Sequence, residues 1–131
     1  MNYIDVCNVE FSTSGKDTTC TISFRYKEPD FLIMDASTFE KIVRRFRKDD
    51  VIYAMNTISA TARCKDGDEF DEMKGRWIAK DKATLRLLEL DTKIAFSVNG
   101  VYNNLIDMNR KLNKKSLKKS HIIINRLKYR Y

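Results

Sequence analysis

The chain has 131 residues, of which 33% are charged and 11% are aromatic. This composition excludes a disordered chain, and the length suits one compact domain with a moderate core rather than a two-domain enzyme. The formal charge of +7 is uneven, because no acidic residue follows Asp107 and nine basic residues follow it. A phosphate-bearing partner is therefore expected at the C-terminal segment, although a solvated charged surface explains the same pattern.

Alternating apolar and polar residues dominate the first part of the chain. Residues 3–11 and 18–26 predict two strands joined by a turn, and the apolar run 31–34 predicts a third strand. Ser37 and Glu40 have the spacing of a capping box, which predicts a short amphipathic helix over 38–48. Residues 51–64 predict one long strand, or two strands that meet at a bend.

The stretch 62–83 predicts the end of a strand, an acidic turn and the start of a helix. Asp68 is expected to cap this helix, with Asp71 three residues later, because carboxylates stabilise a helix N-terminus. Small residues recur every four positions on one helix face, which lets another backbone approach closely. These residues are Gly75, Ala79 and Ala83. Three large residues are expected on the core side of the helix: Phe70, Trp77 and Ile78.

A seven-residue repeat follows and predicts a helix that packs along a long partner. Its two series are Leu87, Ile94, Val101 and Met108, and Asp91, Val98, Leu105 and Leu112. Such a helix would exceed a small domain in length, so it either breaks or pairs with another subunit. Asn99 and Gly100 favour a kink or hinge within the helix. Beyond the repeat, residues 116–120 predict a loop and 121–131 a terminal strand.

Together these elements predict an α+β fold: a small antiparallel sheet with one short helix, then a long helical dimerisation segment and a C-terminal strand. The β-rich part covers 1–67 and the helical part 68–131, within one compact domain overall. A homodimer or higher homo-oligomer is expected. No membrane partner is expected, because no apolar run approaches membrane-spanning length.

The residues that catalysis or metal binding would need are scarce. The three cysteines lack metal-ligand spacing, and the one histidine, His121, lies in a basic segment without nucleophilic or acidic partners. Phosphate-binding glycine loops are absent from the sequence. We therefore expect no enzyme, no metal and no cofactor. An odd number of cysteines without a leader-like N-terminus predicts a cytoplasmic protein.

Two groups of residues could bind a phosphate-bearing ligand. Aromatic, amide and guanidinium groups near the expected hinge could stack on a base and hydrogen-bond to it, although a hydrated helix face explains them as well. This group comprises Tyr102, Asn103, Asn104 and Arg110. The second group consists of basic residues suited to binding nucleic acid: Arg44, Arg45, Lys114, Lys115, Lys118, Lys119 and Arg126.

The stretch 62–83 also carries a resemblance to small accessory proteins of bacteriophages. The shared pattern is a strand ending Ala-Arg-Cys, an acidic turn, Phe-Asp, and a helix with Gly-x-x-Ile-Ala-x-x-Lys-Ala. The matching residues are Ala62, Arg63, Cys64, Asp68, Phe70, Asp71, Gly75, Ile78, Ala79, Lys82 and Ala83. Within these proteins, the stretch resembles the Thoeris anti-defence sponge family.

The resemblance implies a non-catalytic oligomer in the host cytoplasm that sequesters a cyclic ADP-ribose isomer or a cyclic oligonucleotide. Arg63 and Phe70 are then the matched candidates for nucleotide binding. The short helix and the basic C-terminal segment do not match that family. They leave open an alternative function, a phage anti-CRISPR or nucleic-acid-binding protein that acts through the basic segment on a CRISPR effector or on nucleic acid.

Overall fold

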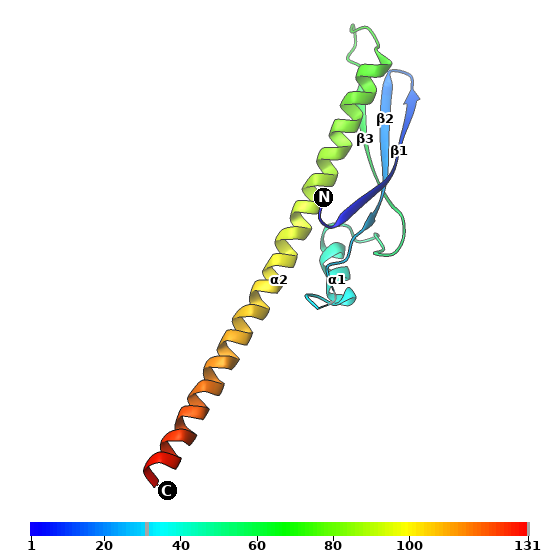
Figure 1. Cartoon of the computed structure of the whole chain (residues 1–131). Coiled ribbons are helices and arrows are strands. Elements are labelled where there is room, and N and C mark those ends of the chain that lie inside the picture. The colour runs from blue at the N-terminus through cyan, green and yellow to red at the C-terminus, as the bar shows by residue number, and fades with distance from the viewer. Residues whose placement is uncertain (31, 131) are drawn as a thin grey trace. The chain divides into compact units, whose positions relative to one another are not determined.

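The chain is α+β in a computed structural model, which describes residues 1–30 and 32–130. A three-stranded antiparallel sheet has the order β1–β2–β3, and one short and one long helix accompany it (Figure 1). The elements are β1 (Ile4–Ser14), β2 (Asp17–Tyr26), α1 (Ala36–Phe46), β3 (Asn56–Arg63) and α2 (Glu72–Arg130). The predicted α+β class is confirmed.

Strands β1 and β2 form a hairpin with a two-residue turn. Gly15 in this turn has φ +61°, a conformation that glycine adopts without steric strain. The pairing runs from Ser14 opposite Asp17 to Ile4 opposite Tyr26, with a register shift between Val6 and Asn8. The hairpin confirms the two strands that the alternating pattern predicts.

One face of the sheet carries the core. Alternate residues of β2 are buried, as the period of two in a half-covered strand requires. Helix α1 contributes Phe39, Ile42 and Val43 to this core, all less than 4% exposed. The buried residues of α2 are Ala79, Ala83, Leu87, Leu90, Asp91, Ile94 and Val98.

The small-residue face of α2 lies directly against β2. A Cβ atom added at Gly75 would lie 2.7 Å from Oγ1 of Thr18, and Ala79 and Ala83 are fully buried. The small residues thus form a close contact, as predicted, although the group nearest to Gly75 is the side chain of Thr18. The prediction for the large residues is wrong: Trp77 is 63% exposed, and Phe70 and Ile78 are also exposed. The small residues occupy the buried face, so the neighbouring large side chains turn toward solvent.

The residue that caps each helix differs from the predicted one. Asp71 rather than Asp68 caps α2, because its Oδ1 accepts bonds from the amides of Met73 and Lys74 at 3.1 and 3.2 Å. Asp68 instead closes a turn, its amide bonding to the carbonyl of Lys65 at 3.1 Å.

In α1 the cap is Asp35, whose carboxylate accepts from the amide of Thr38 at 2.8 Å. The predicted capping box of Ser37 and Glu40 is therefore wrong. Glu40 lies one turn into the helix and forms an ion pair with Arg44.

One predicted strand, and the first residues of another, form turns. The carbonyl of Asp30 accepts bonds from the amides of Ile33 and Met34, which fold this apolar run into a turn; Phe31 lies outside the described residues. The Asn56 side chain donates to the carbonyls of Val51 and Ala54, so β3 starts only at Asn56 and the residues before it form a turn. In both places a local polar contact outweighs the strand preference of the apolar side chains.

The predicted C-terminal strand and the loop before it are wrong. Helix α2 continues through Asn99 and Gly100, through residues 116–120 and on to Arg130. A strand needs a neighbour for its backbone groups, and none of the described strands pairs with this segment, whereas a helix pairs these groups internally. The Lys, Arg and Leu residues that fill the segment also favour helix. Tyr131 lies outside the described residues.

The chain divides into two compact units, Met1–Val98 and Asn99–Tyr131. The boundary expected between residues 67 and 68 falls inside the first unit. Leu87, Asp91 and Ile94 of the heptad repeat are buried within that unit, so their burial requires no second subunit. Later repeat positions in the second unit, such as Leu105 and Leu112, are 44% and 57% exposed. The pairing of α2 with another subunit stays a prediction.

Across the described residues, no helix combines the length and apolar character that crossing a bilayer requires.

Candidate ligand pocket at the start of α2

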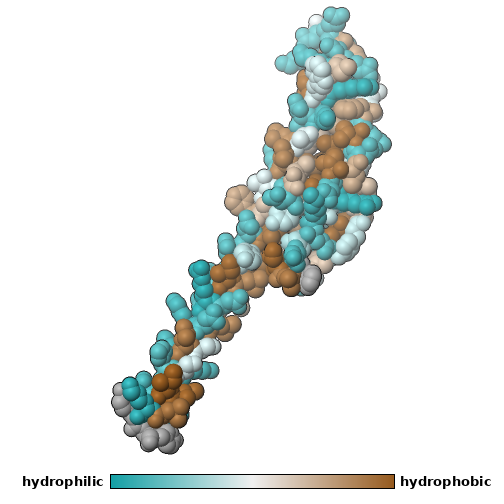
Figure 2. Space-filling view, in the orientation of Figure 1, coloured by the Kyte–Doolittle hydropathy of each residue, from teal (hydrophilic) through white to brown (hydrophobic). Residues whose placement is uncertain are grey.

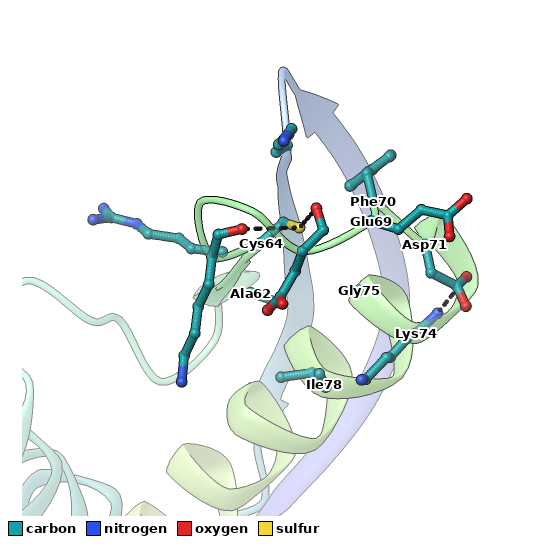
Figure 3. Close-up of a pocket in the computed structure, with 12 residues that line it drawn as sticks. Ala62, Cys64, Glu69, Phe70, Asp71, Lys74, Gly75 and Ile78 are labelled. Atoms are coloured by element: carbon teal, nitrogen blue, oxygen red, sulfur yellow. Dashed lines mark hydrogen bonds between the residues drawn. The ribbon is translucent and has the colours of Figure 1, made fainter.

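A pocket of about 480 Å³ lies where β3 ends and α2 begins (Figure 3). Its walls come from the turn of the β1–β2 hairpin, the last residues of β3, the loop 64–71 and the first two turns of α2. These segments are far apart in the sequence and meet here because the hairpin turn and the C-terminal end of β3 lie at the same end of the sheet.

Charged side chains of both signs line this pocket. Four are basic (Lys16, Arg63, Lys65 and Lys74) and three are acidic (Asp68, Glu69 and Asp71). The Asp71 carboxylate is already bonded to two amides of α2. The Arg63 side chain is 81% exposed, and its Nε lies 3.9 Å from Asp17, a contact too long to hold the guanidinium in place. Arg63 is thus available to an anionic ligand.

Cys64 ties the floor of the pocket together. Its amide bonds to the carbonyl of Lys16 at 3.2 Å, which joins the end of β3 to the hairpin turn. Its Sγ lies 3.5 Å from the carbonyl of Asp68 and 3.7 Å from that of Lys65 (Figure 3). These contacts fix the loop between β3 and α2.

Apolar groups supply part of the wall. Phe70 and Ile78 line the pocket and keep 36% and 38% of their surface exposed. Gly75 adds backbone without a side chain on the same wall. An aromatic ring beside arginine and lysine side chains can stack on a base while the cations bind its phosphates.

The structure brings together two of the predicted nucleotide-binding residues, Arg63 and Phe70. The other four lie in the second unit on exposed positions of α2: Tyr102, Asn103, Asn104 and Arg110. Consecutive helical residues diverge by about 100°, so Tyr102, Asn103 and Asn104 point to three different sides. Only Asn103 and Arg110, seven positions apart, share a helix face.

The predicted nucleic-acid-binding residues are all exposed. Arg44 forms a 2.6 Å ion pair with Glu40, and Arg45 lies beside it on α1. The remaining residues lie along α2: Lys114, Lys115, Lys118, Lys119 and Arg126. On this helix Lys114 and Lys118, and likewise Lys115 and Lys119, lie one turn apart on shared faces.

Arg47 differs from the two arginines before it. Its Nε lies 2.9 Å from Asp50, its Nη2 donates to the carbonyl of Thr57, and its guanidinium lies over the ring of Phe24. Asp50 in turn accepts a bond from the Tyr26 hydroxyl. Burial, together with this bond, raises the pKa of Tyr26 far above its ordinary value. The contacts of Arg47 with Asp50, Thr57 and Phe24 hold the end of α1 on the sheet.

Sequence reasoning missed three basic residues of the pocket: Lys16, Lys65 and Lys74. Lys65 and Lys74 lie within the stretch 62–83, so an inspection of its charged positions could have found them. Lys16 reaches the pocket through the hairpin turn, and only the register of β2 with β3 places it there.

The cysteines and acidic residues do not form a metal site within the described part of the chain. Cys7, Cys20 and Cys64 are free. Burial raises the pKa of the Cys20 thiol, which keeps it protonated and unreactive.

Comparisons with protein-family models, with curated proteins and with solved structures found no match for this chain. The geometry of the pocket and the charge of α2 therefore carry the functional argument.

Proposed function

We propose that this protein is a non-catalytic, homo-oligomeric binding protein that sequesters a cyclic nucleotide immune signal, a phage counter-defence role in the host cytoplasm. The observation that carries the proposal is the pocket of about 480 Å³ that is lined by Arg63 at the end of β3 and by Phe70 in the loop that follows. Its volume falls within the usual range for small-molecule sites, about 300–1,000 Å³.

The chemistry of the pocket suits a nucleotide with more than one phosphate. Arg63, Lys16 and Lys74 approach from three different segments, so their charges can neutralise phosphates that a cyclic ligand presents on different sides. The Phe70 ring offers a stacking surface for a base. A cyclic ADP-ribose isomer or a cyclic oligonucleotide combines these features, and the resemblance of 62–83 to the Thoeris anti-defence sponge family supports that choice.

Sequestration predicts that the ligand leaves the protein chemically unchanged. The purified full chain is mixed with the cyclic ADP-ribose isomer, and free ligand is measured in the filtrate before and after heat denaturation. We expect depletion at first and complete recovery of intact ligand on heating. The same assay with a cyclic dinucleotide distinguishes the two ligand classes. If neither ligand is depleted, or if a hydrolysed product is recovered, the proposal fails.

The matched variants are Arg63→Ala, which removes a pocket cation, and Arg25→Ala, which removes an exposed arginine elsewhere on the sheet. Arg63→Ala should reduce depletion strongly, while Arg25→Ala should leave it unchanged. Equal loss in both variants would indicate a general charge effect and would contradict a pocket-bound ligand.

A second function is favoured by the charge of the second unit. Basic side chains from Arg110 to Lys128 lie on α2 without any acidic residue among them. A helix with this positive charge could bind the phosphates of nucleic acid, either free or bound to a CRISPR effector. Binding should weaken with salt, with a logarithmic slope of about −0.9 for each phosphate that the protein neutralises.

Replacement of Lys114, Lys115, Lys118 and Lys119 by Ala tests this second function. We expect the quadruple variant to lose nucleic-acid binding and its salt dependence while it keeps any nucleotide binding at the pocket. Nucleic-acid binding that survives the four substitutions would contradict the role of this helix.

A further inference from the structure

The two edges of the sheet differ in how they are covered. Along β3, alternate main-chain carbonyls accept bonds from basic side chains: Thr57 from Arg47, Ser59 from Arg86, and Thr61 from Lys82. Long basic side chains across an edge prevent another strand from pairing there. Among residues 1–30 and 32–130, no long basic side chain bonds in this way to the main-chain groups of β1 that follow its register shift at Val6 and Asn8.

The strand register shows which groups of β1 are free. The main-chain groups of successive residues point to opposite sides of a strand. The carbonyl of Ser59 points away from β2, so the main-chain groups of Ala60 point toward β2. Ala60 pairs with Cys20, so the main-chain groups of Cys20 point toward β3. The main-chain groups of the next residue, Thr21, therefore point toward β1. Thr21 pairs with Glu10, which faces β2. The residues whose main-chain groups face the free edge of β1 are Val9, Phe11 and Thr13.

The side chains of these residues leave the apolar face of the sheet unfinished. Phe11 pairs with Cys20, which is fully buried. The guanidinium of Arg76 lies over the Phe11 ring, 5.5 Å from its centroid, and yet Phe11 is 37% exposed. Val6, on the same face before the bulge, is 47% exposed. Apolar side chains on the core face of an open edge gain burial when a further strand extends the sheet.

We propose that β1 pairs antiparallel with β1 of a second copy of this chain, centred on Phe11, to form a continuous six-stranded sheet. This assembly surface does not depend on the ligand proposed above. In this register Phe11 lies opposite Phe11 of the second copy, and Val9 lies opposite Thr13. The three edge-facing residues of each copy then pair with those of the other.

Charge disfavours the register centred one residue earlier. Centring one residue earlier would set Glu10 against Glu10 of the second copy, and like charges directly opposite are unfavourable. With Phe11 at the centre, Glu10 lies opposite Ser12. Aromatic cross-strand pairs are among the more stabilising ones.

Charge also favours this edge over α2 as the surface for a second copy. The unit Met1–Val98 contains sixteen basic and seventeen acidic residues, so two copies meet without net repulsion. The unit Asn99–Tyr131 contains nine basic residues and one acidic residue, so alignment of two copies would bring like charges together. Figure 2 shows hydrophobic residues among hydrophilic ones on the surface.

Thr13→Pro tests the edge selectively. Proline is tolerated where the amide faces the open side of an edge strand, so the hairpin should fold, but the variant cannot accept the second strand. Sedimentation velocity of the full chain at about 50 μM should show a dimer for the wild type and for Thr13→Val, and a monomer with wild-type circular dichroism for Thr13→Pro. A monomeric wild type, or a dimer that survives Thr13→Pro, overturns the proposal, and dissociation of that dimer in Leu105→Glu would place the interface on α2.

A crosslinking experiment reads the register without relying on proline. In a Cys7→Ser, Cys20→Ala and Cys64→Ser background, which removes Cys20 as a cross-strand partner of position 11, Phe11→Cys should give a disulfide-linked dimer under mild oxidation. Ser14→Cys, on the same strand but about 20 Å from its counterpart in this register at about 3.4 Å per residue, should not. Crosslinking at Ser14→Cys in place of Phe11→Cys would contradict the Phe11-centred pairing.

Discussion

A Cβ atom at Gly75 would lie 2.7 Å from Oγ1 of Thr18, so α2 and β2 meet without room for a methyl group. Gly75→Ala should therefore lower the free energy of unfolding by about 1–3 kcal/mol, because the helix must shift away from the sheet. Urea denaturation measures this difference. Gly100→Ala is the matched control: Gly100 lies in the same helix with nothing within 4 Å of an added Cβ. That substitution should raise stability by up to about 1 kcal/mol.

The hydroxyl group of Thr18, which lies at the same contact, supports a second prediction. Its side chain is fully buried, and its hydroxyl has no hydrogen-bond partner among the described residues. Thr18→Val keeps the shape and removes the unpaired hydroxyl, so it should stabilise the fold by about 1 kcal/mol or more. Loss of stability in Thr18→Val, measured by the same denaturation, would show that the hydroxyl has a partner in solution.

These contacts show what sequence patterns could predict. The spacing of Gly75, Ala79 and Ala83 predicts a close helix contact, and alternation predicts β1 and β2, because both patterns follow from the period of a single element. The patterns do not predict the turn before β3 or the cap of α2, because a single side chain decides each of them: Asn56 donates to the carbonyl of Val51, and Asp71 rather than Asp68 caps α2.

The candidate pocket was only partly predictable. Arg63 and Phe70 lie near one another in the sequence, so a local motif found them. Lys16 reaches the pocket through strand register, which no local pattern encodes. The isoleucine run of the C-terminal segment predicts a strand, but a strand also needs a neighbour. None of the described strands pairs with this segment, which is helical.

The buried bond between Tyr26 and Asp50 makes stability depend on pH. Burial and Asp50 raise the pKa of Tyr26 above its ordinary value of about 10. A group with a raised pKa in the folded state stabilises the fold below its unfolded pKa and ceases to do so as pH rises above it. The free energy of unfolding should therefore fall as pH rises beyond about 10. Chemical denaturation at pH 8 to 11 measures the fall, and Tyr26→Phe should flatten it; an equal slope in both proteins would contradict this role.

The basic side chains along β3 should act as edge protection. Lys82→Ala with Arg86→Ala opens the carbonyls of Thr61 and Ser59 to a further strand, so assemblies larger than a dimer should form. Light scattering after size exclusion detects them. Lys80→Ala with Lys93→Ala removes the same charge from exposed positions of α2 and should leave the assembly size unchanged. If the two pairs behave alike, the edge contacts do not limit assembly.

The central claim is that the pocket between β3 and α2 binds a phosphate-bearing nucleotide. Isothermal titration of the full chain with the cyclic ADP-ribose isomer, alongside Arg63→Ala, tests it most directly. We expect saturable binding by the wild type and affinity about 10- to 100-fold weaker in Arg63→Ala, the loss expected for one charged hydrogen bond. No binding heat with the wild type at any temperature tried, or equal affinity in the two proteins, would contradict the account.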